Sequence, residues 1–298
     1  MDWQKTLNIA AIFLVGWLLL IEWDRFGDVK DNRASGIDES VELPARAEFT
    51  TPQIPNDGEE LPSLAVEPQT QQPVLLSSNL VKVKTDVLDV TIDPQGGDIV
   101  EVRLLKHLTA MREDGGEPFT LLTRSIDNQY IAKSGLVGPD ATDTRQGRPL
   151  FATASTSYEM LAGEDQLVVD LTLKQNDVRI VKRFTFTSGG YIIGVEYLIN
   201  NLSEAPWQAA FYGQIKRDSK EPLVKSSGGV APYLGAALRE PETNFAKYDF
   251  ADMQDESVKT SIQAGWVAMV QHYFVSAWVP PREDENTFSL HRICGHRL

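Results

Sequence analysis

Alternating hydrophobic and polar positions predict β-strands through most of the chain, from about residue 79 to residue 285. Val81 and Val83 alternate with lysines, and beyond a short polar step the pattern resumes in shifted phase over residues 88–92. Such a phase shift indicates a bend or a bulge between two strand pieces. Residues 94–98 (PQGGD) are a strong turn signal, and a further alternating run follows over residues 100–104.

A second set of alternating runs lies between residues 167 and 199. Leucine and valine share one face over residues 167–173, and aromatic and β-branched residues share a face over residues 191–199. Between these runs, residues 178–186 place valine, isoleucine and phenylalanine on one face, interrupted by Lys182. Period-two alternation between turn signals is typical of antiparallel sheets with one solvated face. No long stretch here shows helical periodicity, so the predicted fold class is mainly β, a large antiparallel β-sandwich.

The apolar stretch from Gly265 to Pro280 allows two interpretations, a second membrane helix or a pair of buried strands. A membrane helix needs about 20 consecutive apolar residues. This stretch is shorter, carries Gln271 and His272 in its middle, and is rich in β-formers. We therefore predict a pair of buried strands.

A hydrophobic segment predicts an N-terminal signal-anchor transmembrane helix over residues 1–23. Residues 7–21 are apolar apart from Asn8, and a tryptophan flanks each end. A spanning segment is expected to be helical, because lipid offers no partner for free backbone groups. The alternative is a cleaved signal peptide, but residues 22–26 (EWDRF) do not resemble a cleavage site.

Charges around this segment set the expected orientation. Lys5 and the N-terminal amine precede it, and the flank after it is acidic. The positive-inside rule then leaves the N-terminus in the cytoplasm and residues 24–298 in the periplasm. Residues 24–78 combine repeated prolines with many acidic and polar residues. Since such a composition cannot bury enough apolar surface to fold, this segment is predicted to be a disordered acidic, proline-rich linker.

Net charge and cysteine content narrow the function classes. The net charge of -14 argues against nucleic acid as a partner, because binding there depends on Lys and Arg neutralising phosphates. The single cysteine, Cys294, excludes an intramolecular disulfide and a zinc site built on paired cysteines. Neither observation excludes a periplasmic location, since a large domain has core enough without disulfides.

Candidate catalytic and metal-binding residues are few. His107 and His272 are interpreted as a surface and a core residue. His291, Cys294 and His296 lie close in sequence, but their spacing matches no common zinc motif. The sequence contains no GxSxG, P-loop or HExxH motif. We therefore predict no catalytic, cofactor-binding or metal site, and we do not expect an enzyme.

Several spaced motifs resemble the YidC insertases of Gram-negative bacteria, within the YidC/Oxa/Alb family. Residues 83–92 (VKTDVLDVTI) and the turn 96–98 (GGD) resemble the opening of the family's periplasmic domain. Residues 265–280 (GWVAMVQHYFVSAWVP) resemble a signature late in the same domain. Together with the anchor and the linker, the resemblance covers residues 1 to about 285.

This resemblance implies a β-supersandwich, similar to galactose-mutarotase-like folds, and no cofactor. It implies a membrane protein insertase and chaperone for the insertion, folding and assembly of integral inner-membrane proteins, alone or with the Sec translocon. The implied partners are nascent inner-membrane proteins, Sec translocon components and the lipid bilayer, reached through residues 7–23. The implied location is the inner membrane of a Gram-negative bacterium.

The resemblance also implies five further transmembrane helices after the domain. No hydrophobic segment follows residue 285, and residues 286–298 form a basic end to an acidic chain. We interpret residues 286–298 as an aberrant tail and residues 79–285 as a periplasmic β-sandwich domain that lacks its final strands. The chain is thus expected to be a fragment, without insertase activity of its own.

Two other function classes remain open. In a membrane-anchored periplasmic binding or scaffold module, Trp207, Phe211 and Tyr212 would line a groove for glycans or an unfolded client. The interpretation that we favour is that these three aromatics fill the core. A sugar epimerase on a mutarotase-like sandwich would need positioned acid and base groups, commonly a histidine with a carboxylate. Only His107 and His272 lie inside the domain, so this class is not favoured.

Overall fold

The computed structural model describes residues 80–111, 115–126, 128–219, 233–255, 257–271 and 273–292. The anchor expected at residues 1–23 and the linker expected at residues 24–78 lie outside this part of the chain. Within the described residues, no helix combines the length and the apolarity that crossing a membrane requires. Regular structure there is almost entirely β, as predicted, and the one described helix, α2, spans only Asp252–Asp255.

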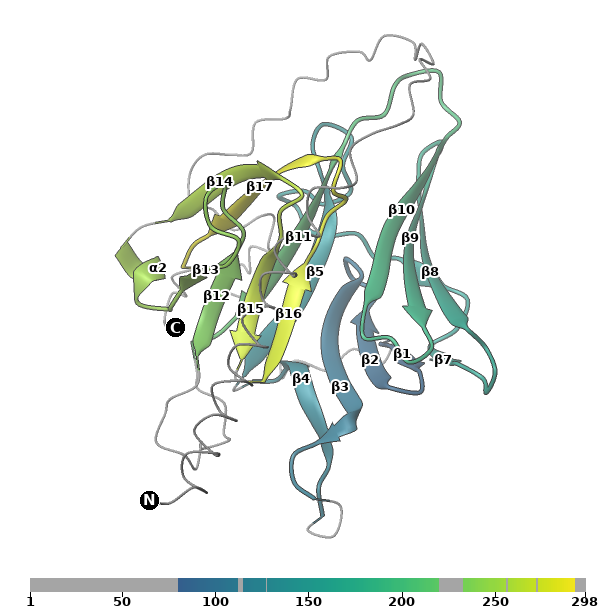
Figure 1. The fold of residues 1–298 in the computed structure, drawn as a ribbon. Coiled ribbons are helices and arrows are strands. Elements are labelled where there is room, and N and C mark those ends of the chain that lie inside the picture. The colour runs from purple at the N-terminus through teal and green to yellow at the C-terminus, as the bar shows by residue number, and fades with distance from the viewer. Residues whose placement is uncertain are drawn as a thin grey trace, which may run out of the picture. The chain divides into compact units, whose positions relative to one another are not determined.

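A seven-stranded sheet forms the larger layer of the fold (Figure 1). Its spatial order is β11-β5-β4-β3-β2-β1-β7, and its neighbours are antiparallel except for the parallel pair β1 and β7. Its strands are β1 (Val81–Lys84), β2 (Leu88–Asp93), β3 (Asp98–Leu108), β4 (Pro118–Arg124), β5 (Gln129–Val137), β7 (Ser157–Glu159) and β11 (Ala210–Arg217).

The phase shift after Lys84 is a hairpin, which corrects the bend or bulge expected from the sequence. Strands β1 and β2 pair antiparallel, with Lys84 opposite Asp89. In the turn between them, the Thr85 hydroxyl accepts hydrogen bonds from the backbone N–H groups of Val87 and Leu88, at 3.2 and 3.0 Å. A side-chain oxygen that accepts nearby backbone N–H groups stabilises a tight turn, so the chain reverses here instead of continuing.

A four-stranded sheet packs against part of the larger sheet. Its order is β10-β9-β8-β6, formed by β6 (Ala152–Thr153), β8 (Gln166–Gln175), β9 (Val178–Thr187) and β10 (Ile193–Asn201). Inward residues of β8 and β9 join residues of β1, β2 and β3 in one hydrophobic core. The alternation predicted for these strands is therefore confirmed, and the core lies between two sheets as a β-sandwich requires.

A second four-stranded sheet has the order β13-β12-β15-β16. It contains β12 (Leu234–Leu238), β13 (Ala246–Tyr248), β15 (Val267–Gln271) and β16 (Phe274–Trp278). The strand pair predicted for residues 265–280 is confirmed, because β15 and β16 pair antiparallel. Burial is confirmed only for β15; β16 alternates between half-buried and exposed positions. His272 lies outside the described residues.

The last described strand corrects the expectation for the end of the chain. Strand β17 (Glu285–Leu290) pairs antiparallel with β14 (Val258–Gln263), and the boundary expected at residue 285 falls inside it. Phe288 and Leu290 are buried, with 6% and 7% of their surface exposed. Residues 286–290 are thus a packed strand of the domain, with the inward alternation that a half-buried strand needs.

Candidate binding cleft

The two four-stranded sheets approach the same face of the seven-stranded sheet with their terminal strands, β10 and β16. On that face Phe211 of β11 lies between one ring from each sheet. Its centroid is 6.0 Å from that of Tyr197 on β10 and 6.1 Å from that of Trp278 on β16. A Cβ on Gly213, two residues further along β11, would lie 2.7 Å from the Trp278 ring, so glycine lets the tryptophan pack on the strand. We call the space between β10 and β16 the cleft.

At another point of the cleft, His107 of β3 also lies between one ring from each four-stranded sheet. Its ring centroid is 5.6 Å from that of Tyr191, just before β10, and 5.7 Å from that of Phe274 on β16. Phe119 of β4 stacks on Phe274 at 4.2 Å. His107 is exposed, so its predicted surface position is confirmed, but it belongs to an aromatic row that spans the cleft.

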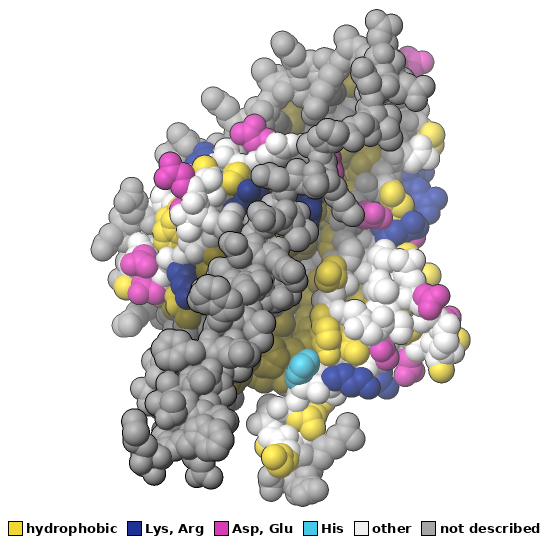
Figure 2. Space-filling model, in the orientation of Figure 1, with side chains coloured by type: hydrophobic (Ala, Val, Ile, Leu, Met, Phe, Trp, Pro, Cys, Tyr) yellow, Lys and Arg dark blue, Asp and Glu magenta, His cyan; other side chains and the backbone are white. Residues whose placement is uncertain are grey.

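The walls of the cleft are open strand edges. Among the described strands, β10 pairs only with β9 and β16 pairs only with β15. Within the described residues the second edge of each strand has no partner strand, and an edge of this kind can pair with another extended segment. Apolar side chains between these edges reach solvent: Phe211 is 49% exposed and Tyr191 45%. Figure 2 shows hydrophobic side chains gathered in a hollow of the visible face.

The three aromatic residues singled out in the sequence have separate positions. Trp207 packs against the hydrophobic core and Tyr212 is buried, as the favoured interpretation predicted. Phe211 points to the opposite face of β11 and lies in the cleft, so the prediction that it fills the core is wrong. Neighbouring residues of a strand face opposite ways, which separates Phe211 from Tyr212.

Lys182 of β9 points into the core between the two layers of the sandwich. It is fully buried, with 0% of its surface exposed. Its Nζ donates to the carbonyl oxygens of Gly96 and Ser134, at 3.0 and 2.8 Å. The same Nζ lies 5.5 Å from the ring centroids of Phe184 and Tyr197. A buried ammonium needs such partners, because burial removes its hydration.

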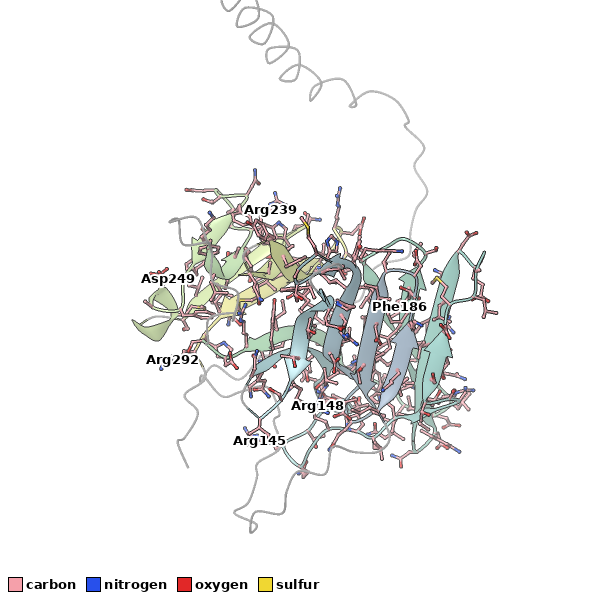
Figure 3. All side chains as sticks on the ribbon, turned by 90° about the horizontal axis from the view of Figure 1, so that it is seen from below. Arg145, Arg148, Phe186, Arg239, Asp249 and Arg292 are labelled. Atoms are coloured by element: carbon pink, nitrogen blue, oxygen red, sulfur yellow. The ribbon has the colours of Figure 1, made fainter. Side chains whose placement is uncertain are left out.

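Arg148 completes a buried charge cluster beside this lysine. Its guanidinium donates to Asp98, and its Nε donates to Asp143 Oδ2 at 2.9 Å. The Tyr212 hydroxyl donates to the same Asp143 oxygen at 2.6 Å. The Arg148 side chain is only 5% exposed, whereas Arg145 of the same loop is exposed (Figure 3).

The charges of this cluster balance when Lys182 is protonated, with two cations facing Asp98 and Asp143. Burial lowers the pKa of Lys182 to about 7; Arg148 adds to this effect, and the two carboxylates oppose it. Burial also raises the pKa of Tyr197 and of Tyr212, which keeps both hydroxyl groups protonated as donors. One carboxylate oxygen, Asp98 Oδ1, is buried and has no hydrogen-bond partner among the described residues.

The chemistry that these groups offer is non-covalent. Lys182 is enclosed, so it serves as an interior support and not as a nucleophile for a ligand in solvent. In the part of the chain that the structure describes, no three His, Cys, Asp or Glu side chains come together as a metal site. His291 follows β17, while Cys294 and His296 lie outside the described residues.

Sequence reasoning found the position of Lys182 but missed its role. The residue was recognised as an interruption in the inward face of residues 178–186, and it occupies an inward position of β9. A lysine in phase with buried phenylalanines is the available signal, because a charged side chain there must find buried partners. Those partners, Gly96 and Ser134, are far away in sequence and could not be assigned by alternation alone.

Comparison with known proteins identifies a family that this chain matches. A sequence model of the YidC periplasmic domain matches residues 80–294. Three similar proteins, each named membrane protein insertase YidC, come from Cellvibrio japonicus, Saccharophagus degradans and Stutzerimonas stutzeri. They are 44%, 40% and 38% identical to this chain, over 98%, 97% and 96% of its length.

The match covers 52%, 53% and 52% of those three proteins, so the chain spans about half the length of the curated relatives it matches. The matched residues include every described strand from β1 to β17. The chain therefore belongs to the YidC periplasmic domain family.

Proposed function

We propose that this chain is the periplasmic part of a membrane protein insertase, and that its cleft holds extended apolar segments of client proteins. The proposal includes insertion, folding and assembly of inner-membrane proteins, alone or with the Sec translocon. Its support from comparison is the family and the names of the relatives. The observation that carries it is the pair of open strand edges, β10 and β16, with exposed aromatic side chains between them.

An extended polypeptide suits such a cleft for two physical reasons. Its backbone completes the hydrogen bonds of an open edge, which is the principle of recognition by strand addition. Its alternate side chains cover the exposed Phe211 and Tyr191 rings, and burial contributes about 25 cal/mol for each Å² of apolar surface. A client that is entering a membrane offers apolar side chains and unpaired backbone together.

The remaining parts of the proposal concern topology. Residues 1–23 act as a signal anchor with the N-terminus in the cytoplasm, and residues 24–78 act as a linker. The β-domain then lies in the periplasm of a Gram-negative bacterium, anchored to the inner membrane. A mutarotase-like supersandwich is the proposed class of the β-domain, with no cofactor and no enzymatic reaction.

Site-specific photocrosslinking tests the role of the cleft. A photoreactive amino acid is placed at Phe211 or at Tyr191 in the full chain, and a client membrane protein is synthesised in its presence. Crosslinks to the client are expected from both positions. Ile126, which is exposed and outside the cleft, is the matched control and should not crosslink. Equal crosslinking at Ile126, or none at either cleft position, would contradict the proposal.

The second candidate function is a membrane-anchored binding or scaffold module that does not insert proteins. The same cleft supports it, because binding an extended segment does not require insertion. Reconstitution of this chain in liposomes with a client separates the two functions. Client that becomes protected from protease supports insertion, whereas crosslinking at Phe211 without protection supports binding alone.

A further inference from the structure

One carbonyl oxygen joins the charge cluster to the wall of the cleft. Ser134 O on β5 accepts hydrogen bonds from Lys182 Nζ at 2.8 Å, from Arg148 Nη2 at 2.8 Å and from the Tyr197 hydroxyl at 3.4 Å. A carbonyl oxygen has two lone pairs, so three donors compete for it. The tyrosine contact is the longest of the three, so this hydrogen bond alone holds the Tyr197 ring only weakly.

Lys182 and Tyr197 are also coupled directly. They are cross-strand partners in the β9–β10 ladder, so their side chains share one face. The Lys182 amine lies over the Tyr197 ring, and a protonated amine is attracted to such a ring more strongly than a neutral one. Tyr197 in turn contacts Phe211 edge-on inside the cleft.

We propose that Lys182 is a positioning residue for the cleft, whose protonated form holds Tyr197 against Phe211 and whose deprotonation releases that ring and weakens binding. This inference rests on the proposed function of the cleft. It concerns the regulation of that site by pH, and it gives no direct contact between Lys182 and the client.

The groups that face Lys182 come from every element packed against it. Asp98 belongs to β3, Asp143 and Arg148 to the loop after β5, and Tyr197 to β10. Tyr212 of β11 acts on this cluster through its hydrogen bond to Asp143. The carboxylates favour the protonated amine, whereas burial and Arg148 disfavour it. These opposed effects place the titration of Lys182 close to neutral pH, where a modest change in acidity alters its charge.

The test measures peptide affinity at two pH values, with the full chain in lipid nanodiscs. The probe is a short capped peptide of alternating leucine and serine, which carries no titratable group. A His107→Gln background removes the histidine of the cleft, so that its imidazole cannot contribute to the pH effect. We expect the dissociation constant to increase about fivefold from about pH 6 to about pH 8.5, as the cation–π attraction is lost. In Lys182→Met, the affinity should be equally weak at both pH values.

A second readout separates this inference from the proposed function. The NMR signal of the Tyr197 ring, followed with labelled tyrosine, should shift with the Lys182 titration and stay constant in Lys182→Met. A moving ring without peptide binding at any pH would refute the client-binding cleft but leave the coupling intact. Peptide affinity that is independent of pH would overturn the inference, and so would a pH effect that persists in Lys182→Met.

If that variant fails to fold, Tyr197→Leu replaces it and should also abolish the pH effect. A wild-type pH profile in Tyr197→Leu would overturn the inference.

Discussion

Lys182 of β9 and Tyr197 of β10 face each other across their ladder, and both donate to the carbonyl oxygen of Ser134 on β5. The smaller sheet is thereby fastened to the larger one by polar contacts in an apolar core. Removing one partner from such a network leaves the others buried without compensation, which costs more than the contact itself contributes.

The first prediction concerns the pH dependence of stability. The folded chain holds the Lys182 pKa at about 7, and an unfolded chain returns it to about 10.4. Between these values the unfolded state binds more protons, so the free energy of unfolding rises with pH. Urea denaturation gives this free energy for wild type and for Lys182→Met. The wild-type value minus the Lys182→Met value should increase from about pH 7 toward pH 10. A difference that is constant or falls over this range would contradict the prediction.

The second prediction compares two arginines of one loop. Arg148→Met leaves Asp98 and Asp143 buried without their cation, and we expect it to lower the free energy of unfolding by about 3–5 kcal/mol. Arg145→Met, in the exposed control position, should change it by less than about 0.5 kcal/mol. Chemical denaturation of both variants measures the contrast. Equal effects would show that the buried cluster is not required for the fold.

The third prediction compares two turn glycines that share a positive φ. Gly97 has φ +67°, and a Cβ there would lie 2.8 Å from Lys182 Cδ. Gly163 has φ +91°, with no atom within 4 Å of its added Cβ. Gly163→Ala should cost about 1–2 kcal/mol for the backbone alone, and Gly97→Ala should cost clearly more because Lys182 must move. Thermal melts that rank the two variants in the reverse order would contradict this.

The fourth prediction concerns β17. Phe288→Ala removes a buried ring that packs against Gly265, and should destabilise the domain by about 3–5 kcal/mol. Ser289→Ala, one residue further on the exposed face, should have little effect. The midpoint of urea unfolding distinguishes them. If both variants unfold at the wild-type urea concentration, residues 286–290 contribute nothing to the fold.

Alternation along the chain was sufficient to predict strands such as β8 and β9, because each of them has one buried face and one more exposed face. Such a strand needs an apolar residue at every second position, and this pattern is visible in the sequence without knowing which strands are neighbours. The pair β15 and β16 was predicted in another way, from the length of its apolar stretch, the polar residues in its middle and its content of β-formers. Alternation does not report pairing, however, so the turn at Thr85 was taken for a bend, although the chain reverses there into a hairpin.

The end of the domain shows a different limit. Residues 286–298 are basic in an acidic chain, so they were predicted not to belong to the domain. Phe288 and Leu290 nevertheless follow the inward alternation of β17. A strand of this length has few inward positions, and its partner β14 lies more than twenty residues earlier. Pairing with β14, and not composition, therefore decides that these residues belong to the domain.

The cleft and the charge cluster could be assigned only from the tertiary structure. Local pattern indicates that Phe211 and Tyr212 face opposite ways, but which face is the core depends on the sheets that pack on β11. Lys182 likewise stood out as an anomaly in its strand, while its acceptors come from a turn and from a strand far away in sequence. Faces and turns follow from short-range sterics and solvation, whereas a site built by distant segments exists only once the chain has brought them together.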